Sequence, residues 1–134
     1  MKKPHLQDKY SLFIDGQWKD ASDGATYDTF CPANEERLAT CAEATKEDVD
    51  TAVKAATQAW QSWKNTDPIV RANLLLKIAD IIDANKEHLA MVETLDNGKP
   101  IRETLNVDIP FAADHFRYFA SVVRTDEGSA TMLD

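Results

Sequence analysis

The stretch Glu93-Thr-Leu-Asp-Asn-Gly-Lys-Pro100 constrains the fold most, because it holds two successive signals that end a helix. Gly98 can adopt the left-handed conformation that closes a helix, and Pro100 cannot continue a helix but can begin a new one. A helix that ends here leaves its last carbonyl groups without partners beside the carboxylate of Asp96. The stretch therefore predicts a concentration of negative charge, either a solvated helix terminus with Lys99 as counter-charge or a weak cation site.

The composition is that of an ordinary globular protein. Hydrophobic residues make up 43% of the 134 residues and charged residues 28%, so the chain can bury a modest core and is one domain or a piece of a larger one. The 15 basic and 23 acidic residues give a net charge of -8, and no basic run alternates with aromatic residues. We therefore expect neither nucleic acid nor an anionic membrane as a partner.

The sequence shows no targeting or membrane-spanning segment. No apolar run approaches the roughly 18 residues of a membrane span. The first residues, Met-Lys-Lys-Pro-His, are followed by polar residues instead of the apolar core of a signal peptide. These features predict a cytoplasmic location.

No grouping of reactive side chains indicates an active site. Cys31 and Cys41 are ten residues apart, which fits neither a redox pair nor a zinc ribbon, and we expect buried free thiols. The three histidines lack metal-ligand spacing, and the four glycines form no phosphate-binding loop. From the residues themselves we therefore predict no catalytic residue and no cofactor-binding residue in this chain.

The first third of the chain predicts short strands separated by turns. Residues 1–10 are polar and are expected to form a flexible N-terminus. Asp15-Gly16 is a two-residue hairpin signal, and Pro32 ends a later run of β-favouring residues. Strands are expected at residues 12–14, 17–19, 26–30 and 37–44.

The middle of the chain predicts two helices. Thr45 and Asp48 have capping-box spacing, and the helix that they start carries Trp60 and Trp63 on one apolar stripe. Two tryptophans at this spacing form either a ligand box or part of the core, and we expect core, because large aromatic residues dominate core burial. Asp67-Pro68 starts a second helix that reaches about residue 83. Its apolar residues cover more than one stripe, so it should be covered on two sides, including by neighbours outside this chain.

The last third predicts further helices. Asn85 is expected to cap a third helix at 85–95, and a short helical turn should follow Pro100. A longer helix is expected near 108–124, with an apolar face made of Ala112, Phe116, Phe119, Ala120 and Val123. Residues 125–134 are polar and lack a structural stop, so we expect a chain that is cut rather than finished.

Five stretches of the sequence, in order, resemble one known family. They are Phe13-Ile-Asp-Gly-Gln-Trp18, Lys46-Glu-Asp-Val-Asp50 with the alanines that follow it, Arg71 with Ala79-Asp80, Glu93 to Pro100, and Phe116-Arg-Tyr-Phe-Ala120. Together they look like the N-terminal part of the NAD(P)-dependent aldehyde dehydrogenase family. The resemblance implies an α/β fold in which a β-hairpin and short strands precede four to five helices. It also implies that residues 11–134 are the N-terminal part of a truncated nucleotide-binding domain.

The resemblance implies that the chain is a fragment of an oxidoreductase that oxidises an aldehyde to a carboxylic acid with NAD(P)+. In the family, the cysteine nucleophile, the glutamate base and nearly all nucleotide contacts lie beyond the segment present here. Cys31 and Cys41 do not match the nucleophile's motif, so the isolated fragment is expected to be inactive. NAD or NADP is expected in the full-length enzyme and not on this fragment, and self-association is expected.

The resemblance also implies two sets of site residues. Thr29, Phe30 and Asp96 correspond to positions whose oxygens bind a monovalent cation in similar members. This agrees with the negative charge expected at the helix end, since hard cations prefer oxygen ligands. Val107 and Phe111 match positions that line the aldehyde entrance tunnel in some members.

One departure from the family pattern and two rival interpretations remain. The family's usual Asn-Pro-x-x-Gly-Glu is here Cys31-Pro-Ala-Asn-Glu-Glu36, which removes both the asparagine and the glycine of the turn beside the cation site. The first rival is a stand-alone helical module that binds another protein through exposed apolar faces, without catalysis. The second is a structural remnant without a ligand.

Overall fold

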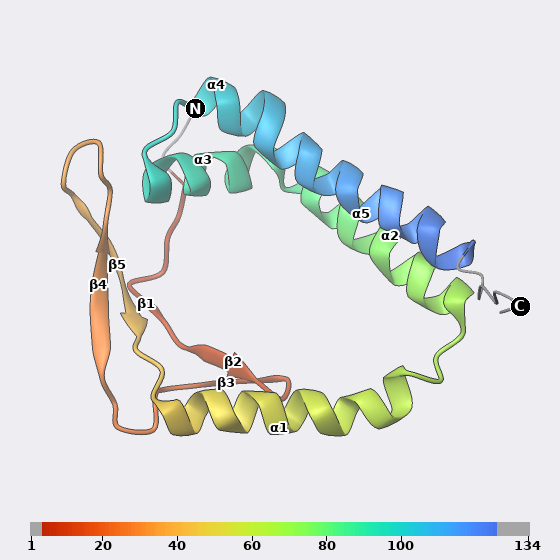
Figure 1. Cartoon of the computed structure of the whole chain (residues 1–134). Coiled ribbons are helices and arrows are strands. Elements are labelled where there is room, and N and C mark those ends of the chain that lie inside the picture. The colour runs from red at the N-terminus through yellow and green to blue at the C-terminus, as the bar shows by residue number, and fades with distance from the viewer. Residues whose placement is uncertain (1–3, 126–134) are drawn as a thin grey trace, which may run out of the picture.

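The structure, a computed structural model, describes residues 4–125. The expectations for residues 1–3 and 126–134 lie outside these described residues. Short strands occupy the first third of the chain and helices the rest, in the order expected from the sequence. Figure 1 shows the strands, the first long helix and a pair of long helices along the sides of a broad ring.

Two small sheets form the N-terminal part. Asp15 and Gly16 both have positive φ angles, 54° and 73°, as the predicted tight hairpin turn requires. The strands are β1 (Lys9–Tyr10), β2 (Leu12–Ile14), β3 (Gln17–Lys19), β4 (Thr26–Phe30) and β5 (Arg37–Ala42). The hairpin forms the first sheet, in which β2 pairs antiparallel with β3. The second sheet has the strand order β1-β5-β4, with β1 parallel and β4 antiparallel to β5. The sheet thus begins at Lys9, inside the segment expected to be a flexible terminus.

The capping box at the start of α1 (Lys46–Trp63) is confirmed. The carboxylate of Asp48 accepts hydrogen bonds from the backbone N–H of Thr45 at 2.9 Å and of Ser22 at 3.1 Å. These two hydrogen bonds lower the pKa of the Asp48 carboxyl group. The same carboxylate therefore starts the helix and ties it to the turn before β4.

The expectation that Trp60 and Trp63 belong to the core is wrong for the described residues. Their exposed fractions are 53% and 43%, and Asp48 is the one residue of α1 that the described structure buries. The reason is the placement of α1, whose main neighbour is the short strand β2 (Figure 1). The helix has the predicted apolar stripe, but little of the described chain lies against that stripe.

Helices α2 (Pro68–Ala84) and α5 (Ile109–Arg124) form the largest packed pair, and they run side by side in Figure 1. Ala79 and Ala113 are fully buried, and side chains of this size let two helix backbones approach closely. Arg117 of α5 donates to Asp83 at 2.6 Å and to Asp80 at 3.1 Å, both on α2. The α2 cap is confirmed, since Asp67 accepts from the backbone N–H of Ile69 at 2.7 Å.

The predicted apolar face of α5 is partly wrong. The structure buries Ile109, Ala113 and Ala120, while Ala112 is half-buried and Phe119 is 52% exposed. The buried face of α5 is thus centred on Ile109, Ala113 and Ala120, of which the expected face contained only Ala120. Large side chains such as Phe119 are therefore left at the sides of the helix pair.

Helix α3 (Lys86–Asn97) ends at Gly98, whose φ of 78° confirms the predicted left-handed cap. Asn85 occupies the predicted N-cap position of α3, but its side chain makes no capping hydrogen bond there. Its side-chain amide donates instead to the carbonyl of Ile81 at 2.8 Å, so it satisfies the end of α2. The last carbonyl groups of a helix lack partners within the helix, and the Asn85 amide satisfies one of them at the end of α2.

The segment after Pro100 forms α4 (Ile101–Glu103), a π-helical turn η1 (Thr104–Asp108) and then α5 without a break. The π-turn was not expected from the sequence. Thr104 and Ile109 are both buried and five residues apart, the spacing that one π-turn keeps on a single face. Thr104 is also the largest fully buried side chain among the described residues, so the core is built from small side chains.

No helix in the range 4–125 is long and apolar enough to cross a membrane.

Candidate functional site

The end of α3 meets the second sheet at the predicted cation site. The hydroxyl of Thr29, on β4, donates to a carboxylate oxygen of Asp96 at 3.3 Å, across 67 positions of sequence. Both residues line a cavity of about 480 Å³, together with Glu93 and Cys41. The remaining lining residues are Leu6, Tyr10, Leu38, Ala39, Leu89, Val92 and Ile109. The structure thus brings Thr29 and Asp96 together in a mainly apolar cavity with two carboxylates.

Phe30 and Lys99 are placed differently from Thr29 and Asp96. Phe30 is absent from the cavity lining, and its side chain is 52% exposed. Lys99, expected as the counter-charge of Asp96, places its ammonium group 2.7 Å from Asp108 and 3.8 Å from Glu93. The hydrogen bond to Asp108 raises the pKa of Lys99. The Asp96 carboxylate therefore has Thr29 and not Lys99 as its partner.

The donor set at the end of α3 fits a hard cation. It consists of two carboxylates, from Glu93 and Asp96, and the hydroxyl of Thr29, all of them oxygen donors. The last carbonyl groups of α3 add partial negative charge nearby. No cluster of three or more His, Cys, Asp or Glu residues suited to a metal occurs between residues 4 and 125, so a cation here would depend on hydroxyl and backbone oxygens as well.

The turn beside this site closes although it lacks the glycine of the family pattern. Cys31 donates its backbone N–H to the carbonyl of Glu36 at 2.9 Å, and Glu35 donates to the carbonyl of Cys31 at 2.8 Å. Glu35 has a φ of 60°, a conformation that glycine adopts with less strain. The chain therefore keeps a tight turn by placing a glutamate in the left-handed region.

Val107 and Phe111, the predicted tunnel residues, lie close together at the junction of η1 and α5. The two residues are 52% and 61% exposed. They are four positions apart, so they lie on neighbouring positions of one helix face. The Phe111 ring contacts the His115 ring edge-on, with centroids 4.1 Å apart. The two residues thus present an apolar surface that the described chain leaves open.

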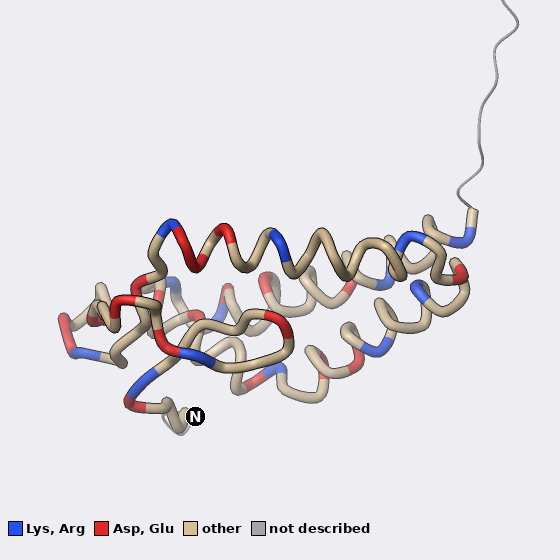
Figure 2. The backbone as a smooth tube through the Cα atoms, turned by 90° about the horizontal axis from the view of Figure 1, so that it is seen from below, with Lys and Arg blue, Asp and Glu red and all other residues tan. Residues whose placement is uncertain are grey.

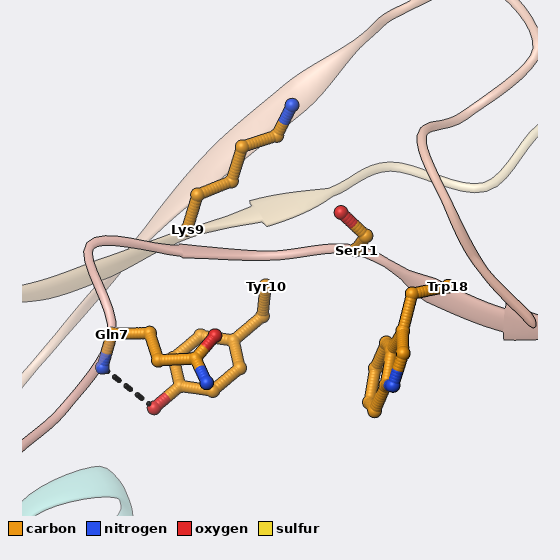
Figure 3. A pocket seen from close by; sticks show the side chains of 5 residues that line it. All are labelled: Gln7, Lys9, Tyr10, Ser11 and Trp18. Atoms are coloured by element: carbon orange, nitrogen blue, oxygen red, sulfur yellow. Dashed lines mark hydrogen bonds between the residues drawn. The ribbon is translucent and has the colours of Figure 1, made fainter.

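A further cavity is lined by the N-terminal segment, which was expected to be flexible, and by Trp18 of a predicted strand. It has a volume of about 390 Å³ and is lined by Gln7, Lys9, Tyr10, Ser11 and Trp18. Figure 3 shows Tyr10 and Trp18 on one side of the strand and Lys9 on the other. The ammonium group of Lys9 is already paired with Asp20 at 2.7 Å. These residues contain no grouping of nucleophile and base, and we assign them no chemistry.

The cysteines and the charge distribution of the described residues complete the survey of candidate sites. Cys31 and Cys41 are both free thiols, as expected. The expected burial is confirmed for Cys31, whereas Cys41 is only half-buried. Figure 2 shows basic and acidic residues interspersed along the backbone, with no continuous basic stripe in the part that the structure describes. The second half of α1 carries no charged residue between Lys54 and Lys64.

A family model and curated relatives all match this chain to aldehyde dehydrogenases. The model of the aldehyde dehydrogenase family matches residues 18–134. The long-chain-aldehyde dehydrogenase of Acinetobacter sp is 46% identical over 132 residues, and an aldehyde dehydrogenase of Vibrio cholerae is 45% identical over 130 residues. These alignments cover 98% and 97% of this chain but 26% of each relative. The chain therefore spans about a quarter of the length of these curated relatives.

A solved structure agrees with the sequence comparisons. The NAD+ complex of an aldehyde dehydrogenase from Bacillus cereus superposes with a TM-score of 0.90 at 38% identity, covering 96% of this chain and 27% of that one. The fold described above is thus similar to that of an aldehyde dehydrogenase solved as an NAD+ complex. The chain belongs to the aldehyde dehydrogenase family.

Proposed function

We propose that this chain is the N-terminal part of an oxidoreductase that oxidises an aldehyde to a carboxylic acid with NAD(P)+. The observation that carries the proposal is the family match over residues 18–134 in a chain that spans 26% of its relatives. When bound, the nucleotide accepts a hydride from the substrate. No residue of this chain is assigned to the nucleotide or to the reacting carbonyl, and the isolated chain is proposed to be inactive.

The proposal is tested by extending the gene and assaying both proteins. The coding region beyond codon 134 should continue in frame to a later cysteine nucleophile. The complete protein should then form NADH or NADPH from an aldehyde, measured by absorbance, and the 134-residue chain should form neither. A natural stop directly after codon 134, or a complete protein that oxidises none of a broad set of aldehydes, would contradict the proposal.

The alternative function is a stand-alone helical interaction module without catalysis. The observation in its favour is the exposure of large apolar residues on α1, α2 and α5, a feature of protein-binding surfaces. It predicts a defined complex of the 134-residue chain with another polypeptide. The family match supports the enzyme better than the interaction module.

We propose that the complete enzyme is located in the cytoplasm and self-associates, and that it binds neither nucleic acid nor membranes.

A monovalent cation is proposed to bind at the end of α3 through oxygens of Thr29, Phe30 and Asp96. The Thr29–Asp96 contact and the carboxylates of the cavity support it. We expect potassium or sodium chloride to raise the melting temperature more than the chloride of a bulky organic cation. Asp96→Ala should remove most of that difference, whereas Asp50→Ala, a change at an exposed acid of α1, should leave it intact. Equal cation responses in wild type and Asp96→Ala would argue against the site.

Val107 and Phe111 are proposed to line the aldehyde entrance of the complete enzyme. Their exposure as a joint apolar surface supports this role. Phe111→Ala should change the preference among aliphatic aldehydes of increasing length by about tenfold, since one or two methylene groups in an apolar pocket discriminate by this factor. The ratio of kcat/KM values for short and long aldehydes measures the effect. Val122→Ala, farther along α5, is the control, and the proposal fails if both variants shift the ratio alike.

A further inference from the structure

The π-turn η1 separates a buried side from an exposed side at the start of α5. The backbone N–H of Ile109 donates to the carbonyl of Thr104, five residues earlier, which is the hydrogen bond that defines a π-turn. Thr104 and Ile109 are buried, whereas Val107 and Phe111 are exposed. An α-helical turn in this place would contain about one residue fewer, so the residues before it would face in other directions relative to α5. The winding of η1 therefore sets where Val107 lies relative to Phe111.

A pair of hydroxyl groups holds the first residue of this turn. Thr104 is fully buried, and its hydroxyl donates to the carbonyl of Ile101 at 3.3 Å. The hydroxyl oxygens of Thr104 and of Thr94, on α3, are 2.8 Å apart. Because the Thr104 proton is directed to Ile101, Thr94 is the donor in this contact. A buried hydroxyl without a partner costs free energy, so this pair fixes the start of η1 against α3.

Lys99 holds the last residue of the turn. Its Nζ atom lies 2.7 Å from Oδ2 of Asp108. The backbone of Lys99 is itself fixed, because its N–H donates to Oδ1 of Asn97 at 2.8 Å, directly after the left-handed cap at Gly98. The two side chains of the ion pair are 49% and 27% exposed, and ion pairs near the surface contribute little to stability. The pair therefore acts mainly by holding Asp108, the neighbour of Val107, near the end of α3.

We propose that Lys99 is a positioning residue for the aldehyde entrance, because its ion pair with Asp108 holds η1 as a π-turn and thereby sets where Val107 faces the substrate. This inference rests on the proposed function, in which Val107 and Phe111 line that entrance. Lys99 acts through Asp108 and does not touch the substrate in this role, since its ammonium group is engaged by that carboxylate. Loss of the ion pair should thus change which aldehydes are preferred and leave the use of the nucleotide unchanged.

Lys99→Met, made in the protein produced from the complete coding region, removes the charge and keeps a side chain of similar length. We expect the ratio of kcat/KM values for short and long aliphatic aldehydes to change by about tenfold, since small changes in an apolar pocket discriminate by this factor. The KM of the nucleotide should stay the same, and Lys99→Arg, which keeps the ion pair, should restore the ratio. Arg102→Met is the matched control, because Arg102 lies just before η1 and pairs with its neighbour Glu103 at 2.7 Å. An unchanged ratio in Lys99→Met, or an equal change in Arg102→Met, would overturn the inference.

A double substitution tests whether Lys99 and Asp108 act as one unit. Asp108→Ala alone should shift the same ratio in the same direction as Lys99→Met. The double variant Lys99→Met with Asp108→Ala should shift the ratio no more than either single variant, because each substitution removes the same ion pair. Single effects that multiply in the double variant would show that the two residues act independently, and this would overturn the inference.

Hydrogen exchange followed by mass spectrometry measures the turn without any aldehyde, and so separates failure of this inference from failure of the proposed function. In the complete protein, the backbone amide of Ile109 should exchange about threefold faster in Lys99→Met than in the wild type, as expected for loss of an ion pair near the surface. Arg102→Met should exchange at the wild-type rate. If aldehydes are oxidised but Lys99→Met changes neither the exchange rate nor the ratio, the positioning role is wrong and the proposed function stands. If no aldehyde is oxidised but Lys99→Met speeds the exchange, the reaction is wrong and the control of η1 by Lys99 stands.

Discussion

At the scale of single residues, Gly98 shows how one position connects local structure to a contact far away in sequence. Its φ of 78° ends α3 in the left-handed conformation. A Cβ atom at this position would lie 3.0 Å from Cγ of Pro32, in the turn that follows β4. The lack of a side chain therefore serves both the helix end and its close approach to the sheet, beside the Thr29–Asp96 contact.

Gly98→Ala should lower the free energy of unfolding by about 1–2 kcal/mol for the left-handed conformation, with a further loss from the contact with Pro32. Gly24→Ala is the matched control, because Gly24 has a φ of 74° and open space around it. Urea unfolding of the 134-residue chain measures both. If the two substitutions cost the same, the approach of α3 to Pro32 contributes nothing.

At the scale of elements, the pairing of α2 with α5 depends on alanine. Ala79 and Ala113 are fully buried, and Ala72 and Ala120 nearly so. The π-turn before α5 keeps Ile109 on the buried face. The Lys99–Asp108 ion pair joins this turn to the segment after α3. The direction of α5 thus follows from two features: the small residues that it packs against α2, and the π-turn from which it starts.

Ala113→Leu should destabilise the chain by about 1–3 kcal/mol, because added methylene groups have no space between closely packed helices. Ala56→Leu, at an exposed position of α1, should change the free energy of unfolding by less than about 0.5 kcal/mol. Urea denaturation followed by circular dichroism compares the two variants. A tolerated leucine at position 113 would show that α2 and α5 are not in close contact.

At the scale of the whole molecule, the large apolar side chains lie outside and the small ones inside. The exposed fractions of Trp18, Trp60 and Trp63 are 70%, 53% and 43%, whereas alanines dominate the buried hydrophobic residues. Among the buried hydrophobic residues of the described chain, only Ile14 and Ile109 are larger than alanine or cysteine. The described chain therefore has the backbone fold of the family but buries only a small hydrophobic core.

In the isolated 134-residue chain, hydroxyl-radical footprinting should oxidise Trp60 and Trp63 at rates similar to that of Trp18. The reason is that oxidation follows solvent exposure, and all three side chains are well exposed. In the complete protein, Trp60 and Trp63 should become protected if later polypeptide covers α1 and α2. Strong protection of Trp60 in a monomeric sample of the isolated chain, checked by sedimentation, would contradict the exposure described here.

Four boundaries of the elements were determined by the sequence alone, because caps and turns act within a few residues. The capping box at Thr45, the Asp67-Pro68 start, the Asp15-Gly16 hairpin and the Gly98 stop all lie where local rules place them. Of the candidate site, the family resemblance implied Thr29, Phe30 and Asp96 as cation ligands, which stays a prediction. The structure places the Thr29 hydroxyl 3.3 Å from the Asp96 carboxylate.

Only the tertiary structure decided which partners and faces these elements use. The Asn85 side chain bonds to the end of α2 instead of the start of α3, and Lys99 pairs with Asp108 instead of Asp96. Trp60 and Phe119 are exposed although their stripes are apolar. Burial depends on which element lies opposite a face, and this is set by contacts between residues far apart in sequence. Periodicity predicts that a face is apolar, but the rest of the fold determines whether anything covers it.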